Sequence, residues 1–401
     1  MSERILTNLG DVITFERGLT YSKADEVPES ATGVLRSNNV DLYNHSLNLD
    51  EIKFLNPSFV VPANKKVRKD SILMCMSNGS KEHLGKVAII DKDLDYAFGG
   101  FMGLLTPNKA KVYPKYLYYT LISPDFKKHI RGLSDGANIN NLKYADLSSF
   151  SFALFPIQEQ QRIVGILDAE FEKIDALKVN AEKNLRNAKD LFQAALRKEI
   201  NSDITQPLIV LCESIIDCPH STPIKSSTKT DYPCIRTSEL GMGNIIWSSM
   251  QYVSKDEYQK RIGRLTPRYE DIVYGREGTI GNAIMIPKEY HFCLGQRTTL
   301  FRPNKSIVNP QYLLYCVLSP FVYKQAMEKN AGCGVAHVNV ADIKQFKIPM
   351  GRTIIEQQSI VSKLDEISNN CNTLQDNYTQ TIALCDDLKQ ALLRKAFSGE
   401  L

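Results

Sequence analysis

The chain has 401 residues, of which 43% are hydrophobic and 23% are charged, so its composition is not that of a disordered protein. Its length exceeds what one hydrophobic core usually organises, and two or more domains are therefore expected. The 49 lysines and arginines nearly balance the 45 aspartates and glutamates, which leaves a formal net charge of +4. This balance excludes strong binding of a polyanion by bulk charge, but it allows a local basic face on one domain.

The sequence carries signals of its compartment. It shows no signal peptide at its start and no run approaching the roughly 20 apolar residues that span a bilayer. Its nine cysteines form no CxxC pair and no regular framework, and free thiols are typical of a reducing compartment. We therefore expect a soluble, cytoplasmic protein that does not contact membranes.

One unit of about 200 residues is repeated along the chain. Matching pairs follow one another in the same order in both halves: residues 36–38 with 236–238, 112–119 with 308–315, 159–161 with 356–358, and 196–198 with 393–395. Because the matches are collinear, the repeat predicts a tandem duplication.

Each copy changes in composition from a globular to a helical segment. Residues 1–155 and 201–349 are rich in Gly, Pro, Asn and Ser around short β-type runs, which predicts two compact α+β domains. Two further segments, 156–200 and 350–401, complete the two copies. Within them, residues 157–199 and 353–397 contain no Pro and almost no Gly, and they follow Pro156 and Pro349. We expect one long helix in each of these two segments.

The predicted helices carry apolar stripes with the three-and-four spacing of a coiled coil. The second stripe comprises Ile360, Leu364, Ile367, Cys371, Leu374, Tyr378, Cys385, Leu388 and Leu392, with Thr381 as a polar member. The first comprises Ile163, Leu167, Ile174, Leu177, Ala181, Ala188, Phe192 and Ala195, with Glu170 interrupting it. Helices of about 43 residues extend ~60 Å. We therefore predict an antiparallel coiled coil that separates the two domains; the alternative is that each helix packs only on its own domain.

Several motifs of the chain occur together in one known family. They are residues 156–164 (Pro-Ile-x-Glu-Gln-Gln-Arg-Ile-Val), the second copy at 355–361, the closing segment 393–401, and the shorter elements at 217–223, 278–281 and 309–312. In their order and duplication, and over essentially its full length, the chain resembles a specificity subunit of a type I restriction-modification system. The first half departs from the pattern because it lacks the Pro-His-x-Thr-Pro element found at 219–223.

The resemblance implies a subunit without catalytic activity that binds double-stranded DNA through two target recognition domains. Each domain would read one half of a bipartite sequence, and the helices would set the unread spacer and dock two modification subunits. Those partners would bind S-adenosylmethionine and methylate adenine N6, and restriction subunits, which are motor nucleases, would join them. The resemblance implies no cofactor in this chain.

Two other functions stay open at this stage: a self-contained DNA adenine methyltransferase, and a helical interaction scaffold that binds no DNA. The chain has no phosphate-binding loop of the Gly-x4-Gly-Lys-Ser/Thr kind. Cys218 and His220 lack a second pair at metal-ligand spacing. We therefore predict no catalytic, cofactor-binding or metal-binding residues.

Candidate DNA contacts lie in loops at equivalent places of the two copies. Readout of base edges requires hydrogen-bonding side chains, whereas phosphate contacts position the protein. The first pair of loops holds Arg36, Ser37 and Asn38 in one copy, and Arg236, Thr237 and Ser238 in the other. An arginine there can grip guanine O6 and N7; the alternative is a salt bridge inside the domain.

Two further pairs of loops are candidates. Lys81 and Arg276 lie in turns that contain glycine, which either offer a cation and backbone amides to phosphate or are ordinary hairpin turns. Polar loops ahead of a strand hold Asn138, Asn140, Asn141, His337 and Asn339. These side chains either read adenine or bind phosphate, or they shape the loop as Asx turns.

Overall fold

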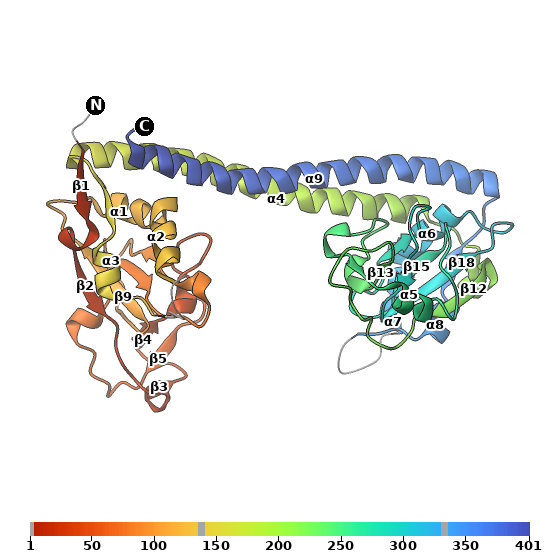
Figure 1. Cartoon of the computed structure of the whole chain (residues 1–401), viewed down its shortest axis with the longest axis horizontal. Helices are drawn as coiled ribbons and strands as arrows, with labels where there is room; N and C mark the ends of the chain where they lie inside the picture. The colour runs from red at the N-terminus through yellow and green to blue at the C-terminus, as the bar shows by residue number, and fades with distance from the viewer. Residues whose placement is uncertain (1–3, 135–140, 330–335) are drawn as a thin grey trace. The chain divides into compact units, whose positions relative to one another are not determined.

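The computed structural model describes residues 4–134, 141–329 and 336–401 (Figure 1). The chain divides into two compact units. Unit 1 comprises Met1–Ala181 and Gln380–Leu401, and unit 2 comprises Glu182–Thr379. Each unit therefore contains one globular domain and a part of both long helices.

Among its described residues, the domain of unit 1 contains two sheets, a strand pair, three α-helices and several short 3-10 helices. The first sheet is antiparallel in the order β2 (Ile13–Arg17), β9 (Met102–Pro107), β6 (Ile72–Cys75), β7 (Val87–Ile89). The second has the order β3 (Glu26–Val27), β5 (Lys53–Leu55), β4 (Thr32–Leu35), β8 (Tyr96–Phe98), and β4 pairs with β8 in parallel. The remaining elements are β1 (Ile5–Asn8) paired with β10 (Ser151–Leu154), and α1 (Pro114–Ile122), α2 (Pro124–Ser134) and α3 (Tyr144–Ser148).

Among the residues that the structure describes, the domain of unit 2 repeats this arrangement with a three-stranded second sheet and one additional α-helix. Its first sheet has the order β12 (Cys212–Asp217), β18 (Thr298–Pro303), β15 (Ile272–Gly275), β16 (Ala283–Met285). Its second has the order β14 (Gln251–Tyr252), β13 (Pro233–Ile235), β17 (Cys293–Leu294), with β13 and β17 parallel. The remaining elements are β11 (Thr205–Pro207) paired with β19 (Lys347–Pro349), and α5 (Lys255–Arg261), α6 (Pro310–Leu318), α7 (Pro320–Glu328) and α8 (Val340–Lys344). The duplication and the α+β class predicted from the sequence are confirmed.

Strand β6 consists of consecutive apolar residues because both of its faces are buried. All four of its side chains are buried, because the strand lies between two cores. Ile72 and Met74 face the core that contains α1, whereas Leu73 and Cys75 face the second sheet. Strand β15 repeats the pattern, with Ile272 on one side and Val273 on the other. Successive side chains of a strand point to opposite faces, so each domain has three layers: helices, first sheet and second sheet.

The two long helices are α4 (Ile157–Glu199) and α9 (Ile354–Ser398). In unit 1 the beginning of α4 packs with the end of α9 in one core, through Leu167 and Leu393. In unit 2 the end of α4 packs with the beginning of α9, through Leu196 and Leu364. The helices therefore run antiparallel, and the predicted coiled coil is confirmed.

The seam between the helices is narrower than the predicted stripe. Its central buried members are small, namely Ala181, Ala188, Cys371 and Cys385, whereas the predicted members Leu177, Leu374 and Leu388 are 51%, 38% and 49% exposed. Small side chains allow close approach of two helix axes, and the larger neighbours then lie outside the contact. The prediction that Leu177, Leu374 and Leu388 belong to the buried seam was therefore wrong.

Buried polar side chains join each domain to the helix that follows it. In unit 1 the side chain of Gln160 accepts a hydrogen bond from the Tyr113 N–H (2.7 Å) and donates to the carbonyls of Lys111 (3.1 Å) and Phe155 (2.7 Å). In unit 2 Gln357 bonds the Asn309 N–H (2.9 Å) and the Arg352 carbonyl (3.1 Å). The repeated Glu-Gln-Gln motif thus has a structural role, because its middle residue caps backbone groups that would otherwise be unpaired.

Candidate nucleic-acid interface

The first pair of predicted loops has the same local structure in both domains. Arg36 follows β4 and Arg236 follows β13, and each precedes a short 3-10 helix, Ser37–Asn39 or Thr237–Glu239. Both arginines have an extended backbone, with φ of −130° and −111°. The order of buried, half-buried and exposed residues is the same over 31–40 and 231–240. The two loops are therefore structural equivalents.

In unit 1 the structure brings the predicted loops together. The Asn78 side chain, in the hairpin loop between β6 and β7, donates a hydrogen bond to the Ser37 hydroxyl (2.8 Å). Ser77 forms a β-bridge with Asn141, and the Leu142 N–H donates to the Met76 carbonyl (2.7 Å). Segments that lie some 40 and 100 residues apart in sequence thus form one polar surface at the end of β4 and β6.

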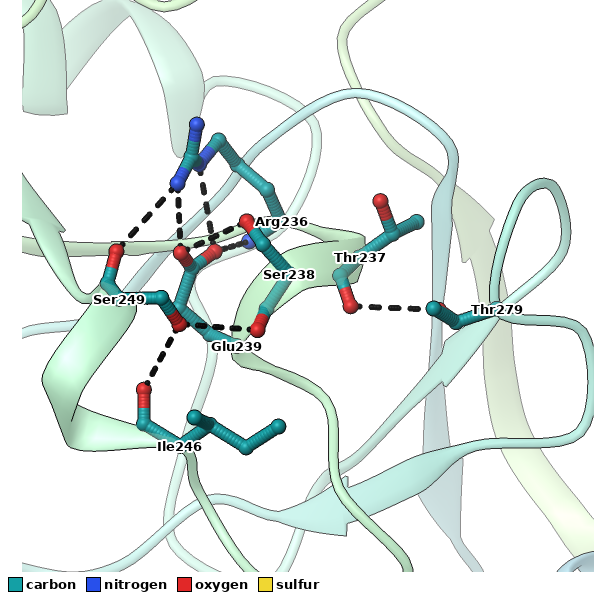
Figure 2. A network of polar contacts seen from close by, with 7 residues as sticks. All are labelled: Arg236, Thr237, Ser238, Glu239, Ile246, Ser249 and Thr279. Carbon is teal, nitrogen blue, oxygen red and sulfur yellow. Dashed lines mark hydrogen bonds and ion pairs between the residues drawn. The ribbon is translucent and has the colours of Figure 1, made fainter. Parts of the chain in front are cut away.

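Unit 2 assembles the equivalent loops through equivalent contacts. The Thr279 hydroxyl donates to the Thr237 carbonyl (3.2 Å), as Figure 2 shows. Glu277 forms a β-bridge with His337, and the Val338 N–H donates to the Arg276 carbonyl (2.8 Å). The convergence of three loops is therefore a property of the repeated fold and not of one domain.

The predicted side chains of unit 1 differ in their surroundings. Arg36 is half-buried and makes no ion pair within the described part of the chain, and its Nε has no hydrogen-bond partner there. Asn38 is exposed, and its amide donates to the Glu51 carbonyl (3.1 Å). Lys81 and Asn141 are exposed. Asn138 and Asn140 lie outside the described residues.

The guanidinium of Arg36 also influences a neighbouring tyrosine. Burial raises the pKa of Tyr21, and the positive charge of Arg36 partly offsets that rise. The positive charge of Arg36 therefore acts on Tyr21, and no ion pair among the residues that the structure describes neutralises it.

In unit 2 two predicted arginines are held in ion pairs. Arg236 binds the carboxylate of Glu239 through its terminal amino group (2.6 Å) and its Nε (3.2 Å). Arg276 binds Asp217 (3.1 Å), and its side chain is 13% exposed. The salt bridge inside the domain, which the sequence left as the alternative for Arg236, is thus present. Arg276 makes an ion pair of the same kind, which the sequence did not suggest.

The other predicted residues of unit 2 are more accessible. Thr237 is half-buried, and His337 and Asn339 are exposed. Asn339 precedes α8, but its side chain does not cap that helix. The loops that contain Asn141 and Asn339 lead first into the short helices α3 and α8 and then into the strands β10 and β19.

Sequence reasoning missed several polar residues next to Arg276. Asp217 also contacts His220 (3.3 Å), and Arg297 pairs with Glu277 (3.0 Å) while its side chain stays 54% exposed. The motif at 217–223 is a sequence signal for this site, because it contains both Asp217 and His220. Arg297 has a φ of 67°, and no local pattern marks a position of that kind in advance.

No group of three or more His, Cys, Asp and Glu side chains that could hold a metal ion occurs among the residues that the structure describes. Within the same residues, no helix is long and apolar enough to cross a membrane.

Comparison with known proteins assigns this duplicated fold. The family model of the type I restriction modification DNA specificity domain matches residues 6–186 and 219–384, which is one match in each copy. The chain belongs to this family. It is therefore a type I specificity subunit, the non-catalytic component of a restriction-modification complex. This confirms the resemblance found in the sequence and favours it over the methyltransferase and scaffold alternatives.

Relatives and solved structures resemble this specificity subunit over nearly its full length. The EcoKI specificity subunit of Escherichia coli K12 is 24% identical and aligns over 99% of this chain and 89% of its own. The StySPI specificity subunit of Salmonella potsdam is also 24% identical, over 97% and 87%. A chain from a study of assembly and conformational transition of the type I system has a TM-score of 0.77 at 18% identity, covering 99% of this chain and 98% of its own. The HsdS subunit of Thermoanaerobacter tengcongensis has a TM-score of 0.55 at 17% identity, covering 99% and 97%. These structures share the fold.

Proposed function

We propose that this specificity subunit binds double-stranded DNA and that each globular domain reads one half of a bipartite target. The observation that carries the proposal is the convergence of three polar loops at one surface in each domain. The duplication supports the proposal that both domains bind their half-sites in the same way, because equivalent strands carry equivalent loops in the two domains. Family membership supports the proposal, since the matching domain is described as a DNA specificity domain.

The exposed side chains of these loops are of the types that form hydrogen bonds with DNA bases and phosphates. Asn38, Asn141 and Asn339 are exposed amides, the groups that pair with adenine N6 and N7. Lys81 and His337 are exposed groups that can approach phosphate. We propose that these residues, with Ser37 and Thr237 beside them, contribute contacts to DNA.

We propose that two modification subunits and the restriction subunits assemble with the chain, and that S-adenosylmethionine is bound by the modification subunits. Exposed aliphatic residues on the long helices support a docking surface for such a partner. In unit 1 these are Leu177, Val179, Leu384 and Leu388, which are between 49% and 61% exposed. Leu384 and Leu388 lie one turn apart on α9, and neighbouring exposed apolar residues are what a protein-binding face presents.

We further propose that the helices fix the length of the unread spacer. Helix α4 has 43 residues and α9 has 45, so each extends ~65 Å at the rise of an α-helix. Half-sites approached from one face of a duplex are separated by whole helical turns, and each turn is about 34 Å long. We place this assembly in the cytoplasm, and the eight described cysteines, all free thiols, support a reducing environment.

Selection from a randomised duplex library tests the proposal. The chain is purified in complex with its modification subunits, and bound duplexes are recovered and sequenced. We expect enrichment of two short motifs separated by a spacer of constant length. Modification subunits without this chain serve as the control and should enrich no motif. A complex that selects no motif, or one continuous motif, would contradict the proposal.

A methyl-transfer assay separates the remaining alternative. The purified chain alone should transfer no labelled methyl group from S-adenosylmethionine to DNA, whereas the complex should. Transfer by the chain alone would identify it as a self-contained methyltransferase.

A further inference from the structure

Arg36 and Arg236 occupy equivalent positions, but their guanidinium groups are in different electrostatic states. The stem of each arginine passes a glycine of the neighbouring parallel strand end: Arg36 Cγ lies 3.6 Å from where Gly99 would carry a Cβ, and Arg236 Cγ lies 2.2 Å from the same point at Gly295. At Gly295 only a residue without a side chain allows that approach. The two side chains therefore leave the backbone at the same place in the two domains.

The residue three positions later differs between the copies. In unit 2 it is Glu239, whose side chain is fully buried and binds the Arg236 backbone N–H (2.8 Å) as well as its guanidinium. Arg236 also donates to the Ser249 carbonyl (3.4 Å), and the Ser249 hydroxyl donates to the Ser238 carbonyl (2.9 Å), as Figure 2 shows. Arg236 is thus one member of a closed network that holds the loop together.

In unit 1 the equivalent residue is Asn39, which is neutral. Its amide oxygen accepts a hydrogen bond from the Arg36 N–H (2.9 Å). Its amide nitrogen donates to the carbonyls of Asn48 (2.9 Å) and Glu51 (3.0 Å). The side chain of Asn39 therefore shapes the loop as Glu239 does, but it leaves the guanidinium of Arg36 without a counter-charge among the described residues.

We infer that Arg36 contacts DNA in the first half-site, that Arg236 is a positioning residue of the second, and that the residue at 39 or 239 decides between the two roles. This inference rests on the proposed function. The group that binds Arg36 is a pair of acceptor atoms presented by DNA, either guanine O6 and N7 or phosphate oxygens. For Arg236 to make the same contact, it would have to leave Glu239 as an unpaired buried charge, which is strongly unfavourable.

Substitutions at Arg36 and Asn39 test the role of Arg36. The complex with modification subunits is titrated with a duplex carrying its selected target. We expect Arg36→Gln to weaken binding about tenfold or more. Asn39→Glu should cause a similar loss because the new carboxylate neutralises Arg36, and adding Asn39→Glu to Arg36→Gln should cause little further loss. Thermal unfolding of Arg36→Gln should be unchanged, which separates a lost contact from a lost fold.

A matched pair tests the role of Arg236. Arg236→Gln alone should lower the unfolding temperature, because it leaves Glu239 unpaired. The double variant Arg236→Gln, Glu239→Gln removes both charges and should regain stability and bind DNA to within about twofold of the unchanged complex. A direct contact by Arg236 would instead leave the double variant as weak in DNA binding as the single one, and this result would overturn its assignment.

Two measurements of DNA binding identify the group that accepts hydrogen bonds from Arg36: its dependence on salt concentration and its dependence on the base at each target position. A phosphate contact predicts that Arg36→Gln lowers the salt dependence of binding by about one counterion without changing base preference. A guanine contact predicts relaxed preference at one position of the first half-site. Binding of Arg36→Gln as tight as that of the unchanged complex overturns the inference and leaves the proposed function intact. Failure of the unchanged complex to select any site removes both.

Discussion

Gln160 and Gln357 show how single residues join each domain to a long helix. Both are almost fully buried, with exposures of 0% and 1%, and each satisfies backbone groups of its own unit. A second contact reinforces each junction, because the hydroxyls of Tyr119 and Tyr315 donate to Asp168 of α4 and Asp365 of α9. The domain is thereby fixed to its helix by hydrogen bonds as well as by apolar packing.

Replacement of Gln160 by leucine should destabilise unit 1. It removes the partners of the Tyr113 N–H and of the carbonyls of Lys111 and Phe155, which should cost about 2–4 kcal/mol. We expect the unfolding temperature of the unit to fall by about 5–10 °C. Gln161→Leu, on the exposed side of the same helical turn, is the matched control and should change it little. Equal unfolding temperatures for the two variants would contradict the role given to Gln160.

His45 should make the stability of unit 1 depend on pH. Burial, aided by the charge of Lys127, lowers the pKa of His45 from 6.5 to about 4, and Asp41 opposes this only in part. Between pH 6.5 and about 4, His45 therefore binds a proton in the unfolded chain but not in the folded chain. The stability contributed by neutral His45 is therefore present above pH 6.5 and is lost as the pH falls towards 4, by up to about 3 kcal/mol.

His45→Asn tests this contribution, because asparagine tolerates the positive φ of 52° at this position and does not titrate. The unfolding free energy of the variant should fall less steeply between pH 6.5 and 4 than that of the unchanged chain. His291→Asn replaces an exposed histidine and should leave the slope unchanged. Parallel curves for all three proteins would refute the assignment to His45.

At the scale of elements, the helices bury a seam of small residues and leave larger aliphatic residues outside. Ion pairs accompany the seam in each unit, with Lys178 bound to Asp386 (2.7 Å) in unit 1 and Lys363 bound to Glu199 (3.1 Å) in unit 2. Because these pairs are partly exposed, each contributes less than about 1 kcal/mol, and the apolar seam supplies most of the association. The exposed leucines are therefore not needed to hold the helices together.

Leu384 and Leu388 lie one turn apart on α9 and are 56% and 49% exposed. If they bind a modification subunit, changing both to serine should weaken that association about tenfold or more while helix content and unfolding temperature stay the same. Size-exclusion chromatography with purified modification subunits measures the effect. Val60→Ser removes an exposed aliphatic side chain from the domain of the same unit and should not alter association. Full association of the double variant would exclude this surface.

At the scale of the whole molecule, the two units share two continuous helices, and the boundary between the units crosses both helices, at Ala181 and at Thr379. The same two elements therefore take part in both cores. A change of helix length in the middle of α4 and α9 would alter neither globular domain.

Removing one heptad from each helix tests the proposed spacer. Deletion of residues 182–188 and 375–381 keeps the three-and-four spacing in phase and shortens the pair by about 10 Å. We expect the spacer of the selected DNA to shorten by about three base pairs, with both half-site motifs unchanged. Library selection with the complex measures both quantities. Altered half-sites with the original spacer would contradict the proposal.

Much of this architecture could be predicted from sequence because it depends on local patterns. The repeat predicts the number of domains, the absence of Pro and the single Gly over 157–199 predict a long helix, and the motifs indicate the family. The candidate loops were also found in this way, because they follow short strands at equivalent places. Their assembly into one surface depends on contacts such as Asn78 with Ser37, which no local pattern predicts.

The amino-acid sequence by itself determined the duplication, the α+β class, the two long helices and the family. These features depend on composition, periodicity and motifs, which are properties of short stretches of sequence. Only the tertiary structure decided which arginine is neutralised, which leucines of the helical stripe are exposed and which glutamine of the repeated motif is buried. The physical reason is that burial and pairing depend on neighbours from distant segments. Asn39 and Glu239 are visible in the sequence, but the direction of their side chains is decided by the folded loop.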